Sequence, residues 1–352
     1  MIKITLPDGS VREFEQGITA MDVAKSISEG LARKVLAANI NGEVWDLSRP
    51  ITSDASLKLL TWDDTDGKST FWHSSAHLMA EAVESMYPGV KFWVGPAIDK
   101  GFYYDMDLGD RQLGEEELEL LENKMTELAK QSNPYQRKAI SKADAVKYFA
   151  DKGDEYKLDL LSNLNDGEIT FYTQGGFTDL CRGPHIPNTG FIKAIKLTNV
   201  AGAYWKGDEK NKQLTRVYGV TFPNQKELDE YLAMLEEAKK RDHRKLGKEL
   251  GIFTMDDDVG QGLPLWLPNG TIIIEELEKL AKETEAAAGY KRVVTPHIAK
   301  ESMYLTSGHL PYYADSMFPP MEMDGTRYYM KAMNCPHHHK IFDAEQKSYK
   351  DL

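Results

Sequence analysis

Cysteine and long apolar runs are scarce in this sequence. Its 352 residues include only two cysteines, Cys181 and Cys335, too few for the disulfide framework of a small secreted protein. No segment approaches the roughly eighteen consecutive apolar residues of a membrane helix. The first residues alternate like a strand and lack the apolar core of a signal peptide. We therefore expect a cytoplasmic protein with no membrane partner.

An overall excess of positive charge is also lacking. The formal net charge at pH 7 is −12, which argues against a protein that coats nucleic acids in general. A local basic patch could still meet one folded RNA, and the stretch 239–249 has six basic residues against two acidic ones. A solvated linker helix is the alternative explanation of such a charge run. The residues expected to contact RNA are Lys239, Lys240, Arg241, Arg244 and Lys245.

The composition and patterning predict several domains. Hydrophobic residues make up 41% and charged residues 28% of the chain, which is ordinary for a globular protein of two or three domains. A polar break at 63–68 separates the first of them from the rest. We expect a multidomain α+β chain with a small domain at 1–62, an α/β domain at 63–224, a linker helix at 225–248 and a third segment at 249–352.

The first 62 residues are patterned like a β-grasp, ubiquitin-like domain. Residues 2–5 and 11–14 alternate in polarity around a Pro-Asp-Gly turn, which is typical of a hairpin. Thr19 can cap a helix after the hairpin, and further strands are expected at 35–40 and 57–60. Domains of this kind are usually binding modules, and no residue pattern in this one points to catalysis.

Two histidines lie on one face of a helix predicted over 71–87. His73 and His77 are four residues apart, so their imidazoles can share a ligand. The glutamate that a zinc protease carries beside its first histidine is absent, because Ser74 occupies that position. We therefore do not expect peptide hydrolysis of that type.

A thiol and a third imidazole come from a tight loop. Gly183 and Pro184 prevent a regular helix between Cys181 and His185. Together with the histidine pair, they form a Cys-His₃ set of metal ligands. The same set suits a metal-free hydrolytic site in which an imidazole moves a proton from water. Spacing alone leaves both readings open.

The motifs in this order resemble the editing domain shared by threonyl- and alanyl-tRNA synthetases. They are His-x-x-x-His at 73–77, Cys-Arg-Gly-Pro-His at 181–185 and Ala-Gly-Ala-Tyr-Trp-Lys-Gly-Asp at 201–208. The β-grasp domain before them is similar to the threonyl arrangement. Similarity continues through Arg-Asp-His-Arg-Lys-Leu-Gly at 241–247 to Met-Asn-Cys-Pro at 333–336. The chain therefore resembles the N-terminal portion of the class II threonyl-tRNA synthetase family.

This resemblance implies a threonine–tRNA ligase that uses ATP and Mg to charge tRNA(Thr) with threonine, and that forms a homodimer at full length. Serine differs from threonine by one methyl, which a single binding site discriminates only about 10–200-fold. The family therefore hydrolyses Ser-tRNA(Thr) at the editing site. The residues carried over are His73, His77, Asp179, Cys181 and His185, with Lys157 and Tyr172 at less closely matched positions.

The third segment resembles the start of a class II catalytic domain, an antiparallel-sheet fold. Residues 271–296 are similar to motif 1, a helix followed by a strand at 291–296. Cys335 aligns with the first zinc ligand of the family's active site, whose histidine partners have no counterpart here. His338 and His339 cannot easily join it, because adjacent side chains on a helix diverge by about 100°. We expect an intact editing site, an incomplete aminoacylation site in a truncated chain, and any bound zinc at the editing cluster.

Two alternatives stay open at this point. A free-standing deacylase that edits tRNA in trans would leave residues 225–352 without a purpose. A non-catalytic RNA-binding regulator would use the β-grasp domain and the basic stretch for binding alone. Hydrolysis of Ser-tRNA(Thr) separates the regulator from the two enzymes.

Overall fold

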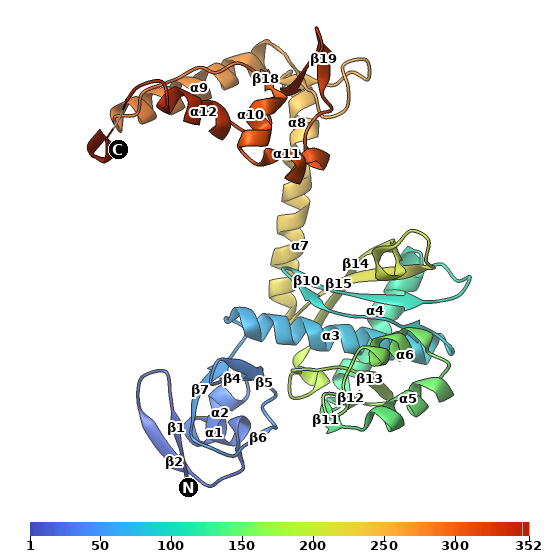
Figure 1. Cartoon of the computed structure of the whole chain (residues 1–352). Helices are drawn as coiled ribbons and strands as arrows, with labels where there is room; N and C mark the ends of the chain where they lie inside the picture. Colours follow the sequence, from blue (N-terminus) through green and yellow to red (C-terminus); the bar gives the residue numbers. More distant parts are fainter. Residues whose placement is uncertain (347, 352) are drawn as a thin grey trace. The chain divides into compact units, whose positions relative to one another are not determined.

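The computed structural model describes residues 1–346 and 348–351 and divides into two units, Met1–Lys239 and Lys240–Leu352 (Figure 1). Each unit combines helices with largely antiparallel sheets, which confirms the expected α+β class. Among the described residues, no helix combines the length and the apolar character that crossing a bilayer requires.

A five-stranded sheet organises the first domain, with strand order β2-β1-β7-β4-β5. The β1–β7 pair is parallel and the other neighbours are antiparallel, so the hairpin expected from the sequence is present. The strands of this domain are β1 (Ile2–Thr5), β2 (Val11–Phe14), β3 (Ile18–Thr19), β4 (Ala37–Ile40), β5 (Glu43–Trp45), β6 (Pro50–Ile51) and β7 (Ala55–Leu60).

The helix of the first domain begins where its cap predicts. Thr19 Oγ1 accepts a hydrogen bond from the backbone N of Asp22 at 3.2 Å, and the Asp22 carboxylate accepts one from the backbone of Thr19, which is a capping box. This helix, α1 (Ala20–Ile27), ends because Ser28 is extended and caps the short α2 (Glu29–Ala32) instead.

A long helix, α3 (Thr65–Met86), opens the second domain and begins earlier than the predicted residue 71. The polar stretch predicted as a break supplies its first turns. Gly67 allows the helix to start here, because a Cβ at that position would overlap the carbonyl oxygen of Thr61, the residue that follows β7. Polarity alone could not reveal this close backbone contact.

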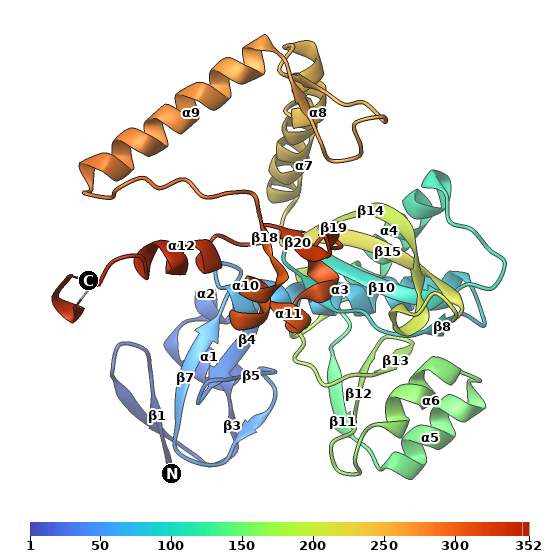
Figure 2. The same cartoon turned by 45° about the horizontal axis from the view of Figure 1, so that its top comes forward.

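Two sheets surround α3 in the second domain. The larger has the order β14-β15-β10-β8, with β9 also paired to β10, and α3 and α4 pack on it. The smaller has the order β11-β12-β13, and α5 and α6 lie side by side next to it (Figure 2). The elements are β8 (Lys91–Phe92), β9 (Ala97–Ile98), β10 (Gly101–Asp107), α4 (Glu115–Lys130), β11 (Gln136–Ala139), α5 (Lys142–Asp151), α6 (Glu155–Ser162), β12 (Thr170–Gln174), β13 (Phe177–Leu180), β14 (Ala194–Tyr204) and β15 (Gln213–Phe222), with 3₁₀ turns η1 (Thr189–Phe191) and η2 (Trp205–Gly207).

The helix predicted over 225–248 is two helices, α7 (Gln225–Lys240) and α8 (His243–Glu249). Asp242 ends the continuity because its side chain caps the second helix, accepting from the backbone N of Arg244 at 2.9 Å and of Lys245 at 3.4 Å. The charge pattern is typical of one continuous solvated helix, so it did not predict that Asp242 starts a second one.

The second unit contains two small antiparallel sheets, β16-β17 and β18-β20-β19. The strand predicted over 291–296 does not form, since these residues pair with no strand among those described, and pairing begins instead at Ile298. The elements are β16 (Phe253–Thr254), β17 (Leu265–Trp266), α9 (Pro268–Ala287), β18 (Ile298–Lys300), α10 (Glu301–Thr306), α11 (His309–Tyr312), η3 (Ala314–Ser316), β19 (Met321–Met323), β20 (Thr326–Met330), α12 (Cys335–Phe342) and η4 (Tyr349–Asp351).

Candidate functional site

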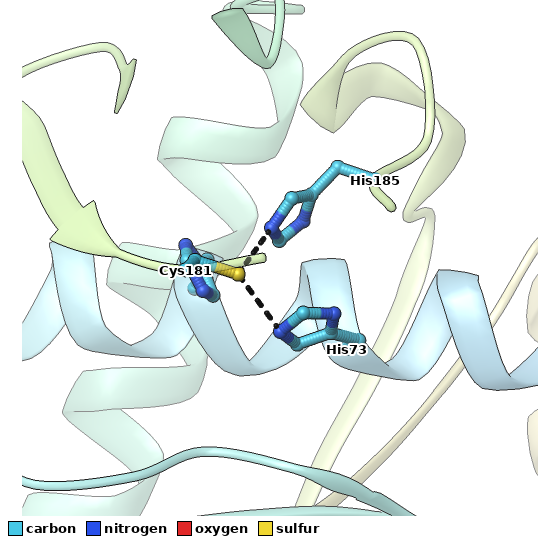
Figure 3. Close-up of side chains that lie close together, drawn as sticks. His73, Cys181 and His185 are labelled. Atoms are coloured by element: carbon cyan, nitrogen blue, oxygen red, sulfur yellow. Dashed lines mark hydrogen bonds between the residues drawn. The ribbon is translucent and has the colours of Figure 1, made fainter. Parts of the chain in front are cut away.

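Three imidazoles and one thiol meet in the second domain. His73 and His77 come from α3, and Cys181 and His185 come from the loop that follows β13. The Sγ of Cys181 lies 3.4 Å from Nε2 of His73 and 3.3 Å from Nε2 of His185 (Figure 3). One donor atom from each of the four residues lies within 4.8 Å of the others. The structure thus brings together residues that are more than 100 positions apart in the sequence.

A glycine shapes the loop that presents the thiol. Gly183 has φ +74°, a left-handed conformation that side chains rarely adopt, and its backbone N donates to Sγ of Cys181 at 3.2 Å. A Cβ on Gly183 would overlap the hydroxyl of Tyr172. The Gly-Pro pair predicted a tight loop, and the structure shows that the turn also points a backbone donor at the sulfur.

Ser74 fixes the proton arrangement of His185. Its hydroxyl donates to the carbonyl of Thr70 at 2.8 Å and accepts from the backbone N of Ile186 at 3.0 Å. Because the bond to Thr70 uses the only proton of this hydroxyl, the contact of 3.0 Å with Nδ1 of His185 favours the tautomer in which the imidazole is the donor. The Nε2 of His185 then carries a lone pair and faces the thiol of Cys181.

A buried ion pair lies beside the imidazoles. The Nζ of Lys157 is 2.7 Å from Oδ1 of Asp179, and the two residues are 2% and 3% exposed. The Nε2 of His77 lies 3.8 Å from the other carboxylate oxygen, Oδ2. Tyr104 donates its hydroxyl to that same oxygen and accepts from Lys157 Nζ at 3.3 Å. The site therefore has a protein cation held next to its histidines.

The position of Lys157 depends on the cap of its helix. Asp154 Oδ1 accepts from the backbone N of Tyr156 at 3.1 Å and of Lys157 at 3.2 Å, which begins α6. Its Oδ2 accepts from the backbone N of Phe92 at 3.1 Å, which ties the helix to β8. The cap therefore sets the point from which the ammonium reaches Asp179.

Burial keeps the imidazoles neutral and the thiol protonated. It lowers the pKa of His73 to about 4 and that of His77 to about 3, and it lowers the pKa of His185 well below its ordinary value. Burial also raises the pKa of the Cys181 thiol to about 12. For Asp179, burial acts to raise the pKa, but the Lys157 ammonium, His77 and the Tyr104 hydroxyl together outweigh it and hold the pKa below its ordinary value. Near neutral pH, the permanent charges here belong to the ion pair.

The donor set fits a zinc ion. Zinc takes nitrogen ligands at about 2.0–2.1 Å and sulfur at about 2.3 Å in a tetrahedron, which separates three nitrogens and one sulfur by roughly 3.3–3.6 Å. The four donor atoms within 4.8 Å approach this spacing. Histidine ligands also usually donate their second ring N–H to a fixed partner, as His185 does to Ser74.

Of the other predicted positions, Cys335 lies apart from this cluster and Tyr172 adjoins it. Cys335 is exposed at the start of α12 and belongs to no group of three or more donor side chains among the described residues. Tyr172 packs its ring 4.5 Å from that of His185, with its hydroxyl bonded to Asp46 at 2.6 Å, so it lies behind the imidazole. The basic residues Lys239, Lys240, Arg241, Arg244 and Lys245 are all exposed.

Sequence reasoning missed three residues that shape the site. Tyr104 alternates inward on β10 with two other apolar residues, so its pattern predicts only a core position. In the sequence, Ser74 is distinctive only because it replaces the glutamate of a zinc protease. Asp46 lies in the first domain, and no local pattern connects it to the histidines. Spatial contacts identify all three, and no motif among those quoted includes Tyr104 or Asp46.

Two family models match this chain. One, described as "TGS domain", matches residues 2–61. The other, described as "Threonyl and Alanyl tRNA synthetase second additional domain", matches residues 169–218, which include Asp179, Cys181 and His185. These matches confirm the nature of both domains that the motifs indicated.

Curated relatives match the whole chain. Proteins named threonine–tRNA ligase from Cytophaga hutchinsonii, Porphyromonas gingivalis and Parabacteroides distasonis are 64%, 57% and 56% identical over 354, 355 and 354 residues. Each alignment covers 100% of this chain and 54–55% of the relative, so the chain spans about half the length of the relatives it matches. A solved structure titled as the RNA binding domain of threonyl-tRNA synthetase from Cryptosporidium parvum aligns at 33% identity, TM-score 0.31, over 32% of this chain and 28% of that one. By sequence, the chain is similar over its whole length to about half of each of these threonine–tRNA ligases.

Proposed function

We propose that the whole protein is a threonine–tRNA ligase and that the site in this chain hydrolyses Ser-tRNA(Thr). The names of the relatives support the ligase, for which threonine, ATP and Mg are the expected substrates and cofactor. The observation that supports hydrolysis is the cluster of three neutral imidazoles and a thiol beside the buried Lys157–Asp179 pair. A homodimer and a cytoplasmic location stay predictions from the resemblance.

The residues of the cluster suit the hydrolysis of an ester by water. A neutral imidazole, such as His73 near the thiol, accepts a proton from the attacking water and returns it to the leaving ribose oxygen. The Lys157 ammonium stabilises negative charge that develops on the ester carbonyl. With its pKa raised to about 12, Cys181 stays a thiol and acts as a hydrogen-bonding group, since the thiolate is the nucleophilic form.

The same four residues would hold zinc if the site takes a metal. His73, His77, Cys181 and His185 supply the ligands, and a bound zinc would polarise the ester or activate water. Lys157 and Asp179 keep their roles as cation and partner in either case. Cys335 is the zinc ligand that the resemblance suggests for a second site, and among the described residues no other donor side chains are grouped with it.

The alternatives account for less of the chain. A free-standing deacylase leaves the residues after 224 unexplained, whereas the relatives match those residues as well. A purely RNA-binding regulator gives no reason for a buried lysine and aspartate beside three imidazoles, an arrangement that is costly unless it is used or fully compensated.

Deacylation by the purified chain tests the proposal. Ser-tRNA(Thr) should be hydrolysed faster than Thr-tRNA(Thr) after subtraction of the spontaneous rate. The double variant His73→Ala/His77→Ala should lose about 100-fold or more of this activity, since general acid–base groups contribute about 10²–10⁴-fold. His338→Ala, at an exposed histidine, is the matched control and should behave as wild type. Equal rates for wild type and the double variant would reject the assignment of the site.

A further inference from the structure

A carboxylate of the first domain reaches the site in the second. Asp46 follows β5 and is buried at 6% exposure. Its Oδ1 accepts from the backbone N of His185 at 2.7 Å, and its Oδ2 accepts from the hydroxyl of Tyr172 at 2.6 Å. Both oxygens of one side chain are therefore bonded to groups that are more than 120 residues away in the sequence.

His185 is held at two points, its backbone and its ring. Asp46 holds the backbone of His185, while Ser74 holds its Nδ1 at 3.0 Å. With backbone and ring both fixed, Nε2 is directed at Cys181, 3.3 Å away. The orientation of the reactive nitrogen thus depends on one contact from each domain.

The bond to Tyr172 secures the rest of the loop. The Tyr172 ring lies 4.5 Å from the His185 ring, and its hydroxyl occupies the space beside Gly183 that a Cβ would need. Burial and the Asp46 carboxylate both raise the pKa of Tyr172, so this hydroxyl keeps its proton and donates it. Among the described residues, the His185 backbone N and the Tyr172 hydroxyl have no other hydrogen-bond partner, so the carboxylate is what fixes both groups in this position.

We propose that Asp46 is a positioning residue through which the TGS domain completes the hydrolytic site. It touches no reacting atom, and it acts by orienting His185 and Tyr172. This inference rests on the proposed deacylation. It assigns the first domain a part in the chemistry, whereas its sequence indicated a binding module only.

Three variants of the full chain separate this role from simple domain stability. Asp46→Ala removes both acceptors. Asp46→Asn can keep both contacts, because its oxygen accepts from the His185 backbone and its NH₂ can donate to the Tyr172 oxygen. Asp54→Ala is the matched control, since Asp54 is an exposed aspartate of the same domain that accepts from the backbone N of Lys3 at 2.7 Å.

The expected effect is on turnover. Asp46→Ala should lower kcat for Ser-tRNA(Thr) deacylation about tenfold or more, with KM changed less than twofold, because a small misplacement of a catalytic group is costly while RNA contacts persist. Asp46→Asn should recover most of the rate, and Asp54→Ala should match wild type. Tyr172→Phe, which removes one of the two bonds and keeps the ring, should fall between Asp46→Ala and wild type.

A second readout does not need activity. In a Cys335→Ser background, the remaining thiol should react faster with a thiol reagent in Asp46→Ala than in wild type, because the loop of Cys181 loses its anchor. If Asp46→Ala does not fold, Tyr172→Phe carries both measurements. An active wild type with unchanged kcat and thiol reactivity in Asp46→Ala and Tyr172→Phe would overturn the role of Asp46 alone. If wild type is inactive but the Cys181 thiol reacts faster in Asp46→Ala, the proposed function is rejected, and the conclusion that Asp46 anchors the loop stands.

Discussion

Lys157 and Asp179 form a buried ion pair, Nζ to Oδ1 at 2.7 Å, within reach of His77. Two charges out of water are costly to maintain, and replacing such a pair with apolar residues is often neutral or stabilising. A buried ion pair beside three imidazoles is therefore weak evidence of stabilisation, and the proposed deacylation gives it a role in chemistry. Tyr104 completes the network by donating to Asp179, which leaves both charged groups with partners.

Replacing the lysine alone should be severe. Lys157→Met leaves Asp179 buried without its cation, and we expect the free energy of unfolding to fall by about 3–5 kcal/mol. The pKa of Asp179 should rise in this variant, because the lysine contributes most of the attraction that opposes the effect of burial. Urea unfolding measures the stability, and deacylation of Ser-tRNA(Thr) should be lost.

A double variant gives the control. Lys157→Met/Asp179→Leu removes both charges and should regain much of the lost stability while remaining inactive. Recovery of activity in the double variant would contradict a catalytic role for the ion pair. A Lys157→Met variant that is as stable and as active as wild type would also contradict the burial of Asp179 beside Lys157.

Acid should destabilise the fold in a defined pH range. An unfolded histidine has a pKa of about 6.5, whereas burial lowers that of His73 to about 4 and that of His77 to about 3. The unfolded chain therefore binds more protons between these values, so the histidines contribute stability that is complete above about pH 6.5 and is lost as pH falls toward 4. Urea unfolding of wild type and His73→Gln/His77→Gln at pH 7, 6 and 5 measures how the free energy of unfolding falls with pH.

The double glutamine variant should show a shallower loss of stability over this range. Deacylation, corrected for spontaneous hydrolysis, should not drop near pH 6.5 in wild type, since the imidazoles are still neutral there. A midpoint of activity at the ordinary histidine pKa would show that these rings are solvated and not buried.

Contacts near in sequence were predictable from residue types, and distant ones were not. The Thr19 cap and the pairing of His73 with His77 are set within four residues, and both are present in the structure. Motif similarity supplied Asp179 and Lys157, which no spacing rule would connect. Tyr104, Ser74 as the partner of His185, and Asp46 depend on contacts across more than 70 residues, where patterns give no information.

The expectations that failed have the same cause. Residues 291–296 are rich in strand-forming side chains but make no ladder, because a strand needs a partner as well as propensity. The break between α7 and α8 comes from the Asp242 cap, which competes with the charge pattern of one long helix. The early start of α3 needs the close approach of Gly67 to Thr61. Each outcome was decided by a specific contact.

Zinc binding should depend on Cys181 and not on Cys335. After chelation and readdition of zinc, we expect Cys181→Ser to bind it much more weakly than wild type, and Cys335→Ser to bind it equally well. The thiol must lose its proton on ligation, and burial raises its pKa to about 12, so the affinity should increase with pH. Competition with a chromophoric chelator at pH 6.5, 7.5 and 8.5 measures this. Loss of stoichiometric zinc only in Cys335→Ser would place the metal site in the second unit.

The backbone conformation of the loop that holds Cys181 should also matter for stability and activity. Gly183 has φ +74°, and for a residue with a side chain this left-handed conformation alone costs about 1–2 kcal/mol. In Gly183→Ala the new Cβ would also overlap the Tyr172 hydroxyl, so the loop must move and take the backbone donor away from Cys181.

We expect Gly183→Ala to lower both the free energy of unfolding and the kcat for deacylation, as measured by urea titration and single-turnover kinetics. Gly176→Ala is the matched control, because a Cβ there meets no atom within 4 Å and its φ is not left-handed. It should behave as wild type in both assays. Equal behaviour of the two variants would mean that the loop tolerates a side chain at Gly183, and that the hydrogen bond from this backbone to the sulfur does not set the reactivity of the site.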